Sequence, residues 1–463
     1  MSSVRITDEP TLSNRERSAA PPGGSLSPSP QREGDLRTHL RQGALGLVDQ
    51  AVVSGTQFLT TVMIGRACGK EELGVFTLAF SFFVIAMGVQ NSFVILPYTI
   101  YTHRLKGADR QTYARSVVVH QGLLALLAAV LCAVAGWGLQ ASSWLPGLGS
   151  TLGALAAVSP LLLFRQFFRH MYLAHLQVVA ASLLDMATCI LQLLALIWLA
   201  AWGWLSPASS YVVMGSAAAL AAIICCWGQI RHLQFSLQKV RESWELHWDL
   251  GKWTFANTMA ALLQSYCMYW ILAIVCGAAE TGQFAACMSI IAVSNPFVIG
   301  ISNTLYPQAS VAYAQGGSHA LQRVVSWATR LLALGIGTLC LGLALGGAFL
   351  VPALYGAQYG GQGPTIALLA AGILLRAVGI GPDIGLLTLE RARETCLLGG
   401  LGLLCTVAAS CLAVMWWGAT GCAAAFLLGN LVTTGLRYPA FRRAAEGVKA
   451  TPAELVIPPL GEV

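Results

Sequence analysis

The sequence is poor in charged residues and lacks the motifs of disulfide-stabilised or zinc-binding soluble domains. Only 10% of its 463 residues are charged, whereas soluble domains carry about 25%. Its 13 cysteines form no CxxC pair and have no nearby histidine at a spacing typical of zinc ligands. The composition therefore argues against an ordinary soluble domain and predicts neither a metal site nor a structural disulfide.

The chain also lacks the motifs of an ATP-driven or catalytic protein. It contains no glycine-rich phosphate loop ending in Lys-Ser or Lys-Thr, so ATP-driven transport is not expected. The predicted external loops are short, and the longest has no ionisable residue to act as acid or base. We therefore expect no enzyme and no catalytic residue. No apolar segment lies near the N-terminus, so no signal peptide is expected.

Long apolar runs are the dominant feature. The chain is 56% hydrophobic with a mean hydropathy of +0.66, and runs of about 18 or more apolar residues recur along it. They predict an all-α polytopic membrane protein with about 12 transmembrane helices. The predicted spans are 44–66, 73–98, 116–140, 151–174, 178–203, 208–230, 253–275, 282–306, 327–351, 364–388, 395–417 and 419–437.

The charges between the spans predict the topology. Basic residues concentrate in the loops after every second span, which predicts that both termini are cytoplasmic. Because they lie in short loops, the formal net charge of +7 does not indicate a nucleic-acid partner. The predicted organisation is a disordered cytoplasmic tail (1–40), an N-terminal lobe of six helices (41–230), a cytoplasmic connector (231–252), a C-terminal lobe of six helices (253–438) and a cytoplasmic tail (439–463).

The two lobes show traces of a common origin. Four residues after the first span recur after the seventh at an offset of 208, and Arg165 recurs as Arg376 at an offset of 211. With six helices each, the lobes run in the same direction, so a pseudo-twofold axis along the membrane normal relates them around a central cavity. The four matched pairs are Gly69/Gly277, Glu72/Glu280, Gly74/Gly282 and Phe76/Phe284.

Six charged residues lie inside predicted spans and away from the residues nearest the span ends. A charge there is expensive, by about 2.5–3.5 kcal/mol for an arginine. Arg165 and Arg376 are candidates for binding phosphate oxygens bidentately. The alternatives are an ion pair with an aspartate, for example Asp185 or Asp383, or snorkelling to the headgroups. Arg169, one turn after Arg165, lies nearer the boundary, and for it an ion pair or snorkelling is favoured over phosphate binding.

Two aspartates are candidates for coupling to a proton or sodium ion. Asp49 lies about one turn into the first span, and its alternative is a carboxylate stabilised by the helix N-terminus and wetted by the cytoplasm. Asp383 follows Gly381 and Pro382, which are expected to break the helix and free carbonyls for a cation. The alternative for Asp383 is a hydrogen-bonded kink.

Uncharged polar residues in the spans are candidates for lining the cavity. They include Thr56, on much the same helical face as Asp49, and three amides in the second and seventh spans. Such residues more often hydrogen-bond between helices, at about 0.6 kcal/mol each, and we favour that interpretation. The amides are Gln90, Asn91 and Asn257.

Three stretches give the chain a resemblance to a known family. Residues 51–66 lead into 69–76, residues 277–284 repeat the pattern, and residues 354–361 read Leu-Tyr-Gly-Ala-Gln-Tyr-Gly-Gly. Over roughly residues 40–440 the chain resembles the polysaccharide-transport (O-antigen) flippases of the multidrug/oligosaccharidyl-lipid/polysaccharide exporter superfamily. The resemblance implies two lobes around a cavity that opens alternately to either side, and an oligosaccharide on a polyprenyl diphosphate as cargo.

The resemblance also implies a setting. The protein is expected in the cytoplasmic (inner) membrane of a bacterium as a monomer, in lipopolysaccharide or other surface-polysaccharide biosynthesis, in contact with membrane lipids. Its expected partners are a polysaccharide polymerase and a chain-length regulator, and no cofactor is expected besides a coupling proton or sodium ion.

Two alternatives to a flippase remain open. A drug or metabolite:cation antiporter of the same superfamily would favour a cavity dominated by carboxylates, whereas the spans, away from their ends, hold three arginines and three aspartates. A membrane enzyme of polysaccharide assembly would need a larger external loop.

Overall fold

The computed structural model describes residues 30–105, 107–142, 144–231 and 240–447, all of which belong to helices or their connecting turns. The chain divides into two compact units, Met1–Ala44 and Leu45–Val463, and the helical bundle belongs to the second. The N-terminal half contains α1 (Pro30–Ala67), α2 (Lys70–Gln90), the π-helix η1 (Asn91–Ile95), α3 (Leu96–Tyr101), α4 (Gly107–Ser142), α5 (Leu148–Ala174), α6 (Val178–Ala201) and α7 (Pro207–Arg231).

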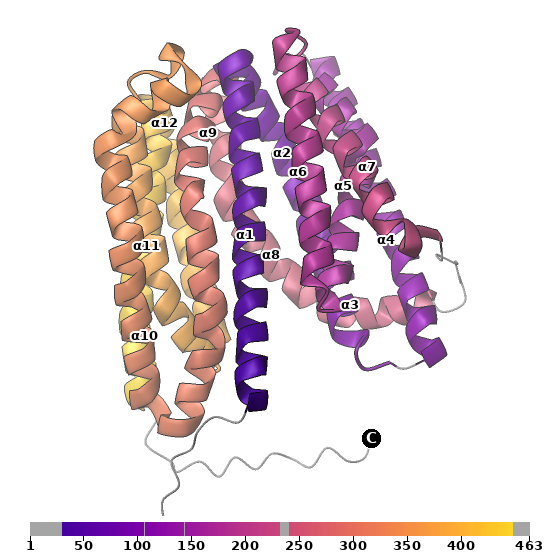
Figure 1. Ribbon diagram of the computed structural model, residues 1–463. Helices are drawn as coiled ribbons and strands as arrows, with labels where there is room; N and C mark the ends of the chain where they lie inside the picture. The colour runs from indigo at the N-terminus through magenta and orange to yellow at the C-terminus, as the bar shows by residue number, and fades with distance from the viewer. Residues whose placement is uncertain (1–29, 106, 143, 232–239, 448–463) are drawn as a thin grey trace, which may run out of the picture. The chain divides into compact units, whose positions relative to one another are not determined.

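The C-terminal half begins at α8 and contains two very long helical segments (Figure 1). Its elements are α8 (Val240–Cys276), α9 (Ala278–Ile291), the 3-10 turn η2 (Ala292–Ser294), α10 (Asn295–Tyr355), the 3-10 turn η3 (Ala357–Tyr359), α11 (Gly363–Thr388) and α12 (Ala392–Gly447).

Within the described residues, 9 helical segments are long and apolar enough to cross a membrane. Two exceed a single crossing: Ala278–Tyr355 has 78 residues and Ala392–Gly447 has 56. Non-helical backbone at Gly316 and Gly317 divides the first, and at Gly418 the second. With these divisions and the part of α1 from Leu45 onward, which is not among the nine, the predicted twelve crossings are accounted for. The chain is an all-α polytopic membrane protein.

The predicted tails and connector differ in part from the observed helices. Residues 30–40 were expected to be disordered but are helical, because Pro30 is a favoured first residue and good helix formers follow it. The predicted connector 231–252 is partly helical, since α8 starts at Val240, and α12 extends to Gly447. Residues 1–29 and 448–463 lie outside the described part of the chain. The lobe boundaries stay predictions.

The repeated residues occupy equivalent places in the two halves. Gly69 precedes α2 with φ 96° and ψ 178°, and Gly277 precedes α9 with φ 88° and ψ −176°. Only glycine adopts this region readily, so both positions require it. Phe76 and Phe284 are both buried, one in each half. The predicted duplication is thus visible in backbone conformation as well as in burial.

The two matched helices cross at a backbone-to-backbone contact. A Cβ added at Gly74 would lie 2.0 Å from the carbonyl oxygen of Ala278, and one at Gly282 would lie 1.8 Å from that of Lys70. Lys70 and Ala278 are themselves 208 residues apart. Each half therefore places a glycine against the equivalent carbonyl oxygen of the other half, as a pseudo-twofold axis between α2 and α9 requires.

The turn between α10 and α11 also packs on the N-terminal half. The Tyr359 hydroxyl donates to the carbonyl oxygen of Gly65 at 3.2 Å, and Arg66 Nη1 donates to that of Ala353 at 3.3 Å. A Cβ at Gly65 would lie 2.5 Å from the Tyr355 ring, so glycine admits the aromatic side chain there. The end of the bundle where α1 meets α2 is held together by these contacts.

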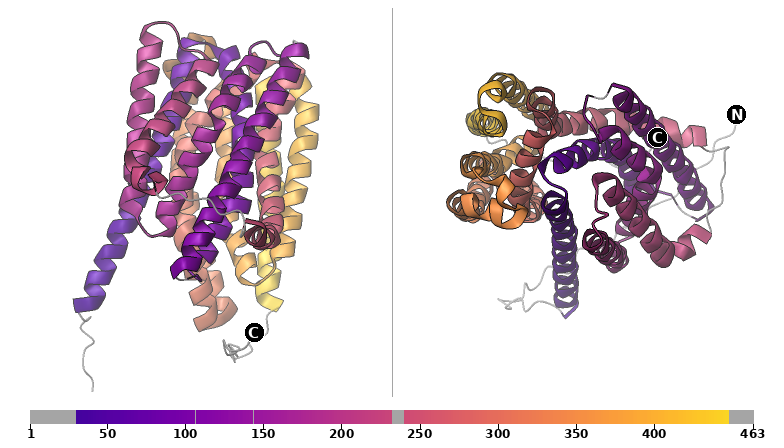
Figure 2. Two further views of the ribbon diagram at one scale, coloured as in Figure 1. Left: turned by 90° about the vertical axis from the view of Figure 1, so that its right-hand side faces the viewer. Right: turned by 90° about the horizontal axis from the view of Figure 1, so that it is seen from above.

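Helix α8 joins the halves, as the views in Figures 1 and 2 show. It contacts α2, η1 and α4 on one side and α9 and α12 on the other. The buried ring of His247 anchors it: Nδ1 donates to the carbonyl oxygen of Phe93 at 2.8 Å, and Nε2 accepts from the Tyr113 hydroxyl at 2.9 Å. The usual helical donor to that carbonyl would be residue 97, but Pro97 has no N–H. His247 therefore satisfies a carbonyl that the sequence of α3 leaves unpaired.

We predict that Gly74→Ala or Gly282→Ala lowers the melting temperature of the purified protein by several degrees. The added methyl group meets backbone, and overpacking of this kind costs about 1–3 kcal/mol. Gly55→Ala is the control, because a Cβ there has nothing within 4 Å. Equal melting temperatures for the three variants would contradict the close crossing of α2 and α9.

We also predict a pH dependence of stability from His247. Burial, with a contribution from His120, lowers the pKa of His247 to about 4 from its usual 6.5. As the pH falls from 6.5 toward 4 the unfolded chain takes up the proton and the folded protein does not. Stability present above pH 6.5 is thus lost by on the order of 3 kcal/mol. Thermal unfolding at pH 4.5 and 7 checks this. His247→Gln should show a smaller difference, and an unchanged one would refute the assignment.

Candidate functional site

The N-terminal half contains a network of four charged side chains. Arg165 and Arg169 lie one turn apart on α5, and both donate to the carboxylate of Asp185 on α6. Arg169 Nη2 also donates to Asp49 Oδ2 of α1 at 2.9 Å. The Asp185 side chain is 0% exposed, while Arg165 and Arg169 are 14% and 16% exposed. Two guanidinium groups and two carboxylates thus neutralise one another inside the helices.

These contacts show which structural alternatives hold for the charged residues of the N-terminal half. Arg165 is in an ion pair with Asp185, one of the two partners considered from the sequence, and Arg169 is in ion pairs with Asp185 and Asp49. The expectation that Asp49 lies near a helix N-terminus is wrong, because α1 already begins at Pro30. Whether Arg165 and Arg169 also meet a phosphate, and whether Asp49 couples an ion, stay predictions.

The C-terminal half holds charges that do not cancel. Arg376, in the middle of α11, has no hydrogen bond or ion pair within the described part of the chain. Its side chain is exposed although it lies deep among protein atoms. That combination is typical of a side chain lining an open cleft. Two turns further along α11, Asp383 Oδ1 lies 3.2 Å from Arg437 Nη2 of α12. These neighbouring turns of α11 and α12 therefore carry two guanidinium groups and one carboxylate.

The predicted break at Asp383 is not present. Helix α11 runs from Gly363 to Thr388 with Pro382 inside it. The surrounding helices pack closely on this stretch: a Cβ at Gly381 would meet the Thr329 hydroxyl at 2.3 Å, and one at Gly385 would meet the Phe441 ring at 2.4 Å. Packing on both sides keeps the helix continuous, so the expected break is absent, although Pro382 has no N–H to donate to the carbonyl oxygen of Val378.

A cavity of about 230 Å³ lies between the halves, bounded by α2, η1, α5 and α8. Its apolar lining includes Met87 and Leu262. Arg165 Nη1 donates to Gln166 Oε1 at 3.3 Å, which joins the charge network of α5 to the cavity wall. A mixed lining of this kind suits a ligand with both polar and apolar parts. The polar side chains of the wall are Asn91, Gln166, His170 and Thr258.

The four polar cavity candidates have different positions. Asn91 is exposed and lines the cavity. Gln90 is fully buried and donates to Gln121 and to the carbonyl oxygen of Leu163, so it bonds between helices instead. Thr56 is buried and donates to the carbonyl oxygen of Val52 in its own helix. The side chain of Asn257 lies outside the described residues.

Sequence reasoning missed Arg437 as part of the site. It is the last residue of the predicted span 419–437, where an arginine at the end of an apolar run indicates a membrane boundary rather than a binding group. Its contact with Asp383 depends on how α12 packs along α11, which no local pattern reports. A polar residue within a helix that continues to Gly447 was the available signal.

We predict that Asp185→Asn destabilises the protein by about 3–5 kcal/mol, because it leaves Arg165 without its carboxylate inside the bundle. The matched control is Glu394→Gln, which removes one negative charge from an exposed pair with Arg391 and should change stability by less than about 1 kcal/mol. Thermal unfolding of both variants checks this. Similar melting temperatures would contradict a structural role for the N-terminal network.

Comparison with known proteins identifies the fold but not the family. No family model and no curated protein matches the sequence. The inward-facing conformation of a multidrug resistance MATE family transporter of the MOP superfamily matches with a TM-score of 0.72 at 15% identity, over 86% of this chain and 96% of that one. The lipid II flippase MurJ in its inward closed conformation matches with a TM-score of 0.65 at 10% identity, over 86% and 89%.

An outward-facing conformation of a MATE family transporter matches less well, with a TM-score of 0.56 at 12% identity, over 88% of this chain and 95% of that one. Of these three structures, the two in inward conformations have the higher TM-scores. The chain has the fold of MOP superfamily transporters.

Proposed function

We propose that this protein is a flippase that moves an oligosaccharide linked to a polyprenyl diphosphate across a bacterial cytoplasmic membrane, for surface-polysaccharide biosynthesis. The cargo combines a sugar that needs a polar cavity, a diphosphate that needs cations and a tail that stays in lipid. The polar side chains of the cavity wall support the first need, and the arginines of α11 and α12, which lie outside that wall, support the second.

Arg376 carries this proposal. An arginine inside an apolar span is costly unless it is paired or functional, and Arg376 has no partner among the described residues. A guanidinium group presents a fork of N–H donors that matches phosphate oxygens bidentately. An exposed, unpaired arginine in the middle of a membrane-spanning helix is therefore best explained by an anionic ligand.

The state of the aspartates argues against a cavity for cationic drugs. Asp185 is fully buried, Asp49 is paired with Arg169, and Asp383 is paired with Arg437. Among the described residues, each intramembrane aspartate thus already has a cationic partner. A cationic ligand would have to separate one of these pairs before it gained a counter-charge, whereas an anionic ligand finds Arg376 available.

The contacts between the halves support alternating access. The crossing at Gly74 and Gly282 holds one end of the bundle together, and the cavity lies toward the other. Opening at the opposite side would separate α2 from α9 while the repeated halves keep their internal packing. We propose that a proton or sodium ion drives the cycle, with Asp49 and Asp383 as candidate coupling sites.

We also propose a membrane topology, an oligomeric state and partner proteins for the flippase. The basic loops favour cytoplasmic N- and C-termini. A flippase of this kind would act as a monomer beside a polymerase and a chain-length regulator, on a lipid-linked substrate made at the cytoplasmic face.

The test is transport of a polyprenyl-diphosphate-linked oligosaccharide in proteoliposomes. Arg376→Ala, at equal membrane abundance, should reduce the rate by about tenfold or more, because a hydrogen bond to a charged group contributes about 1.5–3 kcal/mol. Arg165→Ala should also reduce transport, together with stability, because it disturbs the Asp185 network.

Arg391→Ala is the matched control, since its exposed pair with Glu394 lies outside the site, and it should transport normally. Normal transport by Arg376→Ala, combined with loss of cationic dye efflux in Asp49→Asn, would refute the flippase and establish the drug:cation antiporter.

A further inference from the structure

We propose that Arg437 and Arg376 form a two-arginine diphosphate site, and that Asp383 occupies Arg437 as an internal competitor until the ligand displaces it. This inference rests on the proposed function for its ligand class. It adds a second binding residue, Arg437, and assigns Asp383 to the control of ligand affinity.

Measured along the axis of α11, Arg437 lies between Arg376 and Asp383. The Thr434 hydroxyl donates to the carbonyl oxygen of Leu375 at 2.9 Å, and the Phe441 ring packs on Gly385. The two helices run alongside each other between these contacts. Arg437 therefore projects from α12 between the levels of Arg376 and Asp383.

The ion pair between Asp383 and Arg437 is loosely made. The two side chains are 24% and 19% exposed, and Asp383 Oδ1 and Arg437 Nε have no hydrogen-bond partner among the described residues. By contrast, both carboxylate oxygens of Asp185 accept from arginines. The C-terminal pair thus keeps one carboxylate oxygen and one guanidinium N–H without a hydrogen-bond partner in the described part of the chain, and both of these atoms are buried although the side chains are partly exposed.

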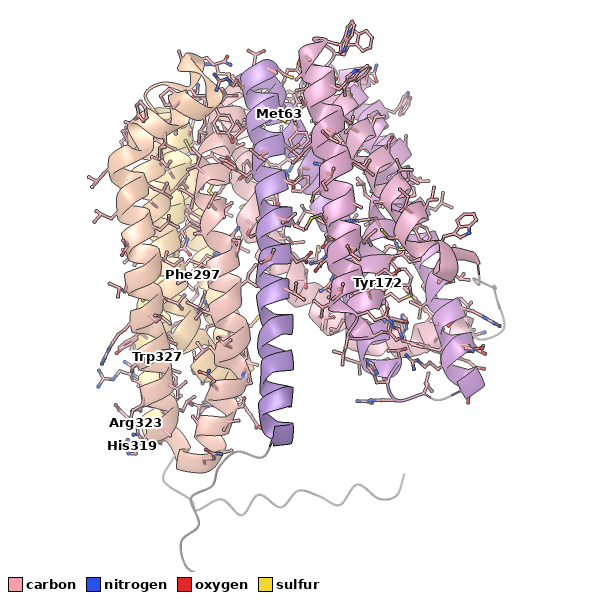
Figure 3. All side chains as sticks on the ribbon, viewed as in Figure 1. Met63, Tyr172, Phe297, His319, Arg323 and Trp327 are labelled. Carbon is pink, nitrogen blue, oxygen red and sulfur yellow. The ribbon has the colours of Figure 1, made fainter. Side chains whose placement is uncertain are left out.

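At the corresponding position in the N-terminal half, a contact between helices is made by an uncharged hydrogen bond. The offset of 211 that relates Arg165 to Arg376 relates Tyr172 to Asp383. The Tyr172 hydroxyl, labelled in Figure 3, donates to the carbonyl oxygen of Cys225 of α7 at 2.8 Å. A neutral hydrogen bond therefore joins the equivalent helices there. The charged pair of the C-terminal half is beyond what the packing of the fold requires, which favours a role in binding.

Electrostatics favours a contact of Arg437 with Asp383 over one with Arg376. The charge of Arg437 acts unfavourably on Arg376, so the two guanidinium groups do not converge unaided. A diphosphate carries at least two negative charges and offers oxygens to both forks at once. Binding would then exchange one carboxylate for the diphosphate at Arg437 and give Arg376 its first partner.

Competition by Asp383 gives a specific pattern of affinities for inorganic pyrophosphate, measured by calorimetry on the full chain in nanodiscs. Asp383→Asn should tighten pyrophosphate binding by about tenfold, because the internal competitor is removed. Arg437→Gln should weaken it by about tenfold, and Asp383→Asn should have no further effect in the Arg437→Gln background. Arg437→Lys, which keeps the charge but loses the fork, should lie between Arg437→Gln and the unchanged protein.

Glu394→Gln is the matched control, because it removes the same charge outside the site, and it should bind pyrophosphate unchanged. Each variant is compared at an equal folded fraction, measured by thermal unfolding. If Asp383→Asn fails to tighten binding, or tightens it equally without Arg437, the competition is refuted.

A parallel titration with a polyprenyl diphosphate distinguishes the source of the phosphate. The same pattern with both ligands supports a site for any diphosphate, and the pattern with the lipid alone supports a site that also needs the tail. Pyrophosphate binding with this pattern, but without oligosaccharide transport, would overturn the flippase and leave the anion site standing. Oligosaccharide transport without any effect of Asp383→Asn on pyrophosphate affinity would refute the competition and leave the flippase standing.

Discussion

The crossing of α2 and α9 is the contact on which the arrangement of the two halves depends. Gly74 and Gly282 each bring the backbone of one half against a carbonyl oxygen of the other, at positions related by the same offset of 208. Any side chain would meet backbone there, so the contact exists only because both positions are glycine. Helix α8, anchored by His247 to the carbonyl of Phe93, provides the second connection. The cavity between α2, α5 and α8 lies between these two attachments.

The duplicated scaffold carries its charges unequally, and this difference is the basis of the functional argument. In the N-terminal half, Arg165 and Arg169 are neutralised by Asp185 and Asp49, and the network is largely buried. In the C-terminal half Asp383 pairs with Arg437 alone, in a partly exposed contact, and Arg376 has no partner among the described residues. One half thus uses its arginines to join helices, while the other retains a positive charge that a ligand can neutralise. A protein built on a repeat can in this way assign stability to one copy and recognition to the other.

Much of the fold could be predicted because its causes are local. Long apolar runs determine the spans, and a glycine needed for φ near 90° recurs at Gly69 and Gly277 as a visible repeat. The site could be predicted only in part from the sequence. Asp185 could be named as a partner for Arg165, but the choice between an ion pair and a phosphate depends on how α5 meets α6. The break expected at Pro382 was wrong, because neighbouring helices bury that stretch, and Arg437 was missed, because its level along α11 is set by tertiary packing.

The most direct test of this account is an experimental structure of the full chain in lipid nanodiscs with a bound polyprenyl diphosphate. The account predicts phosphate oxygens within hydrogen-bonding distance of the Arg376 guanidinium, with Arg165 and Arg169 still bonded to Asp185. A diphosphate bound to Arg165 and Arg169, with Asp185 displaced and Arg376 empty, would contradict it.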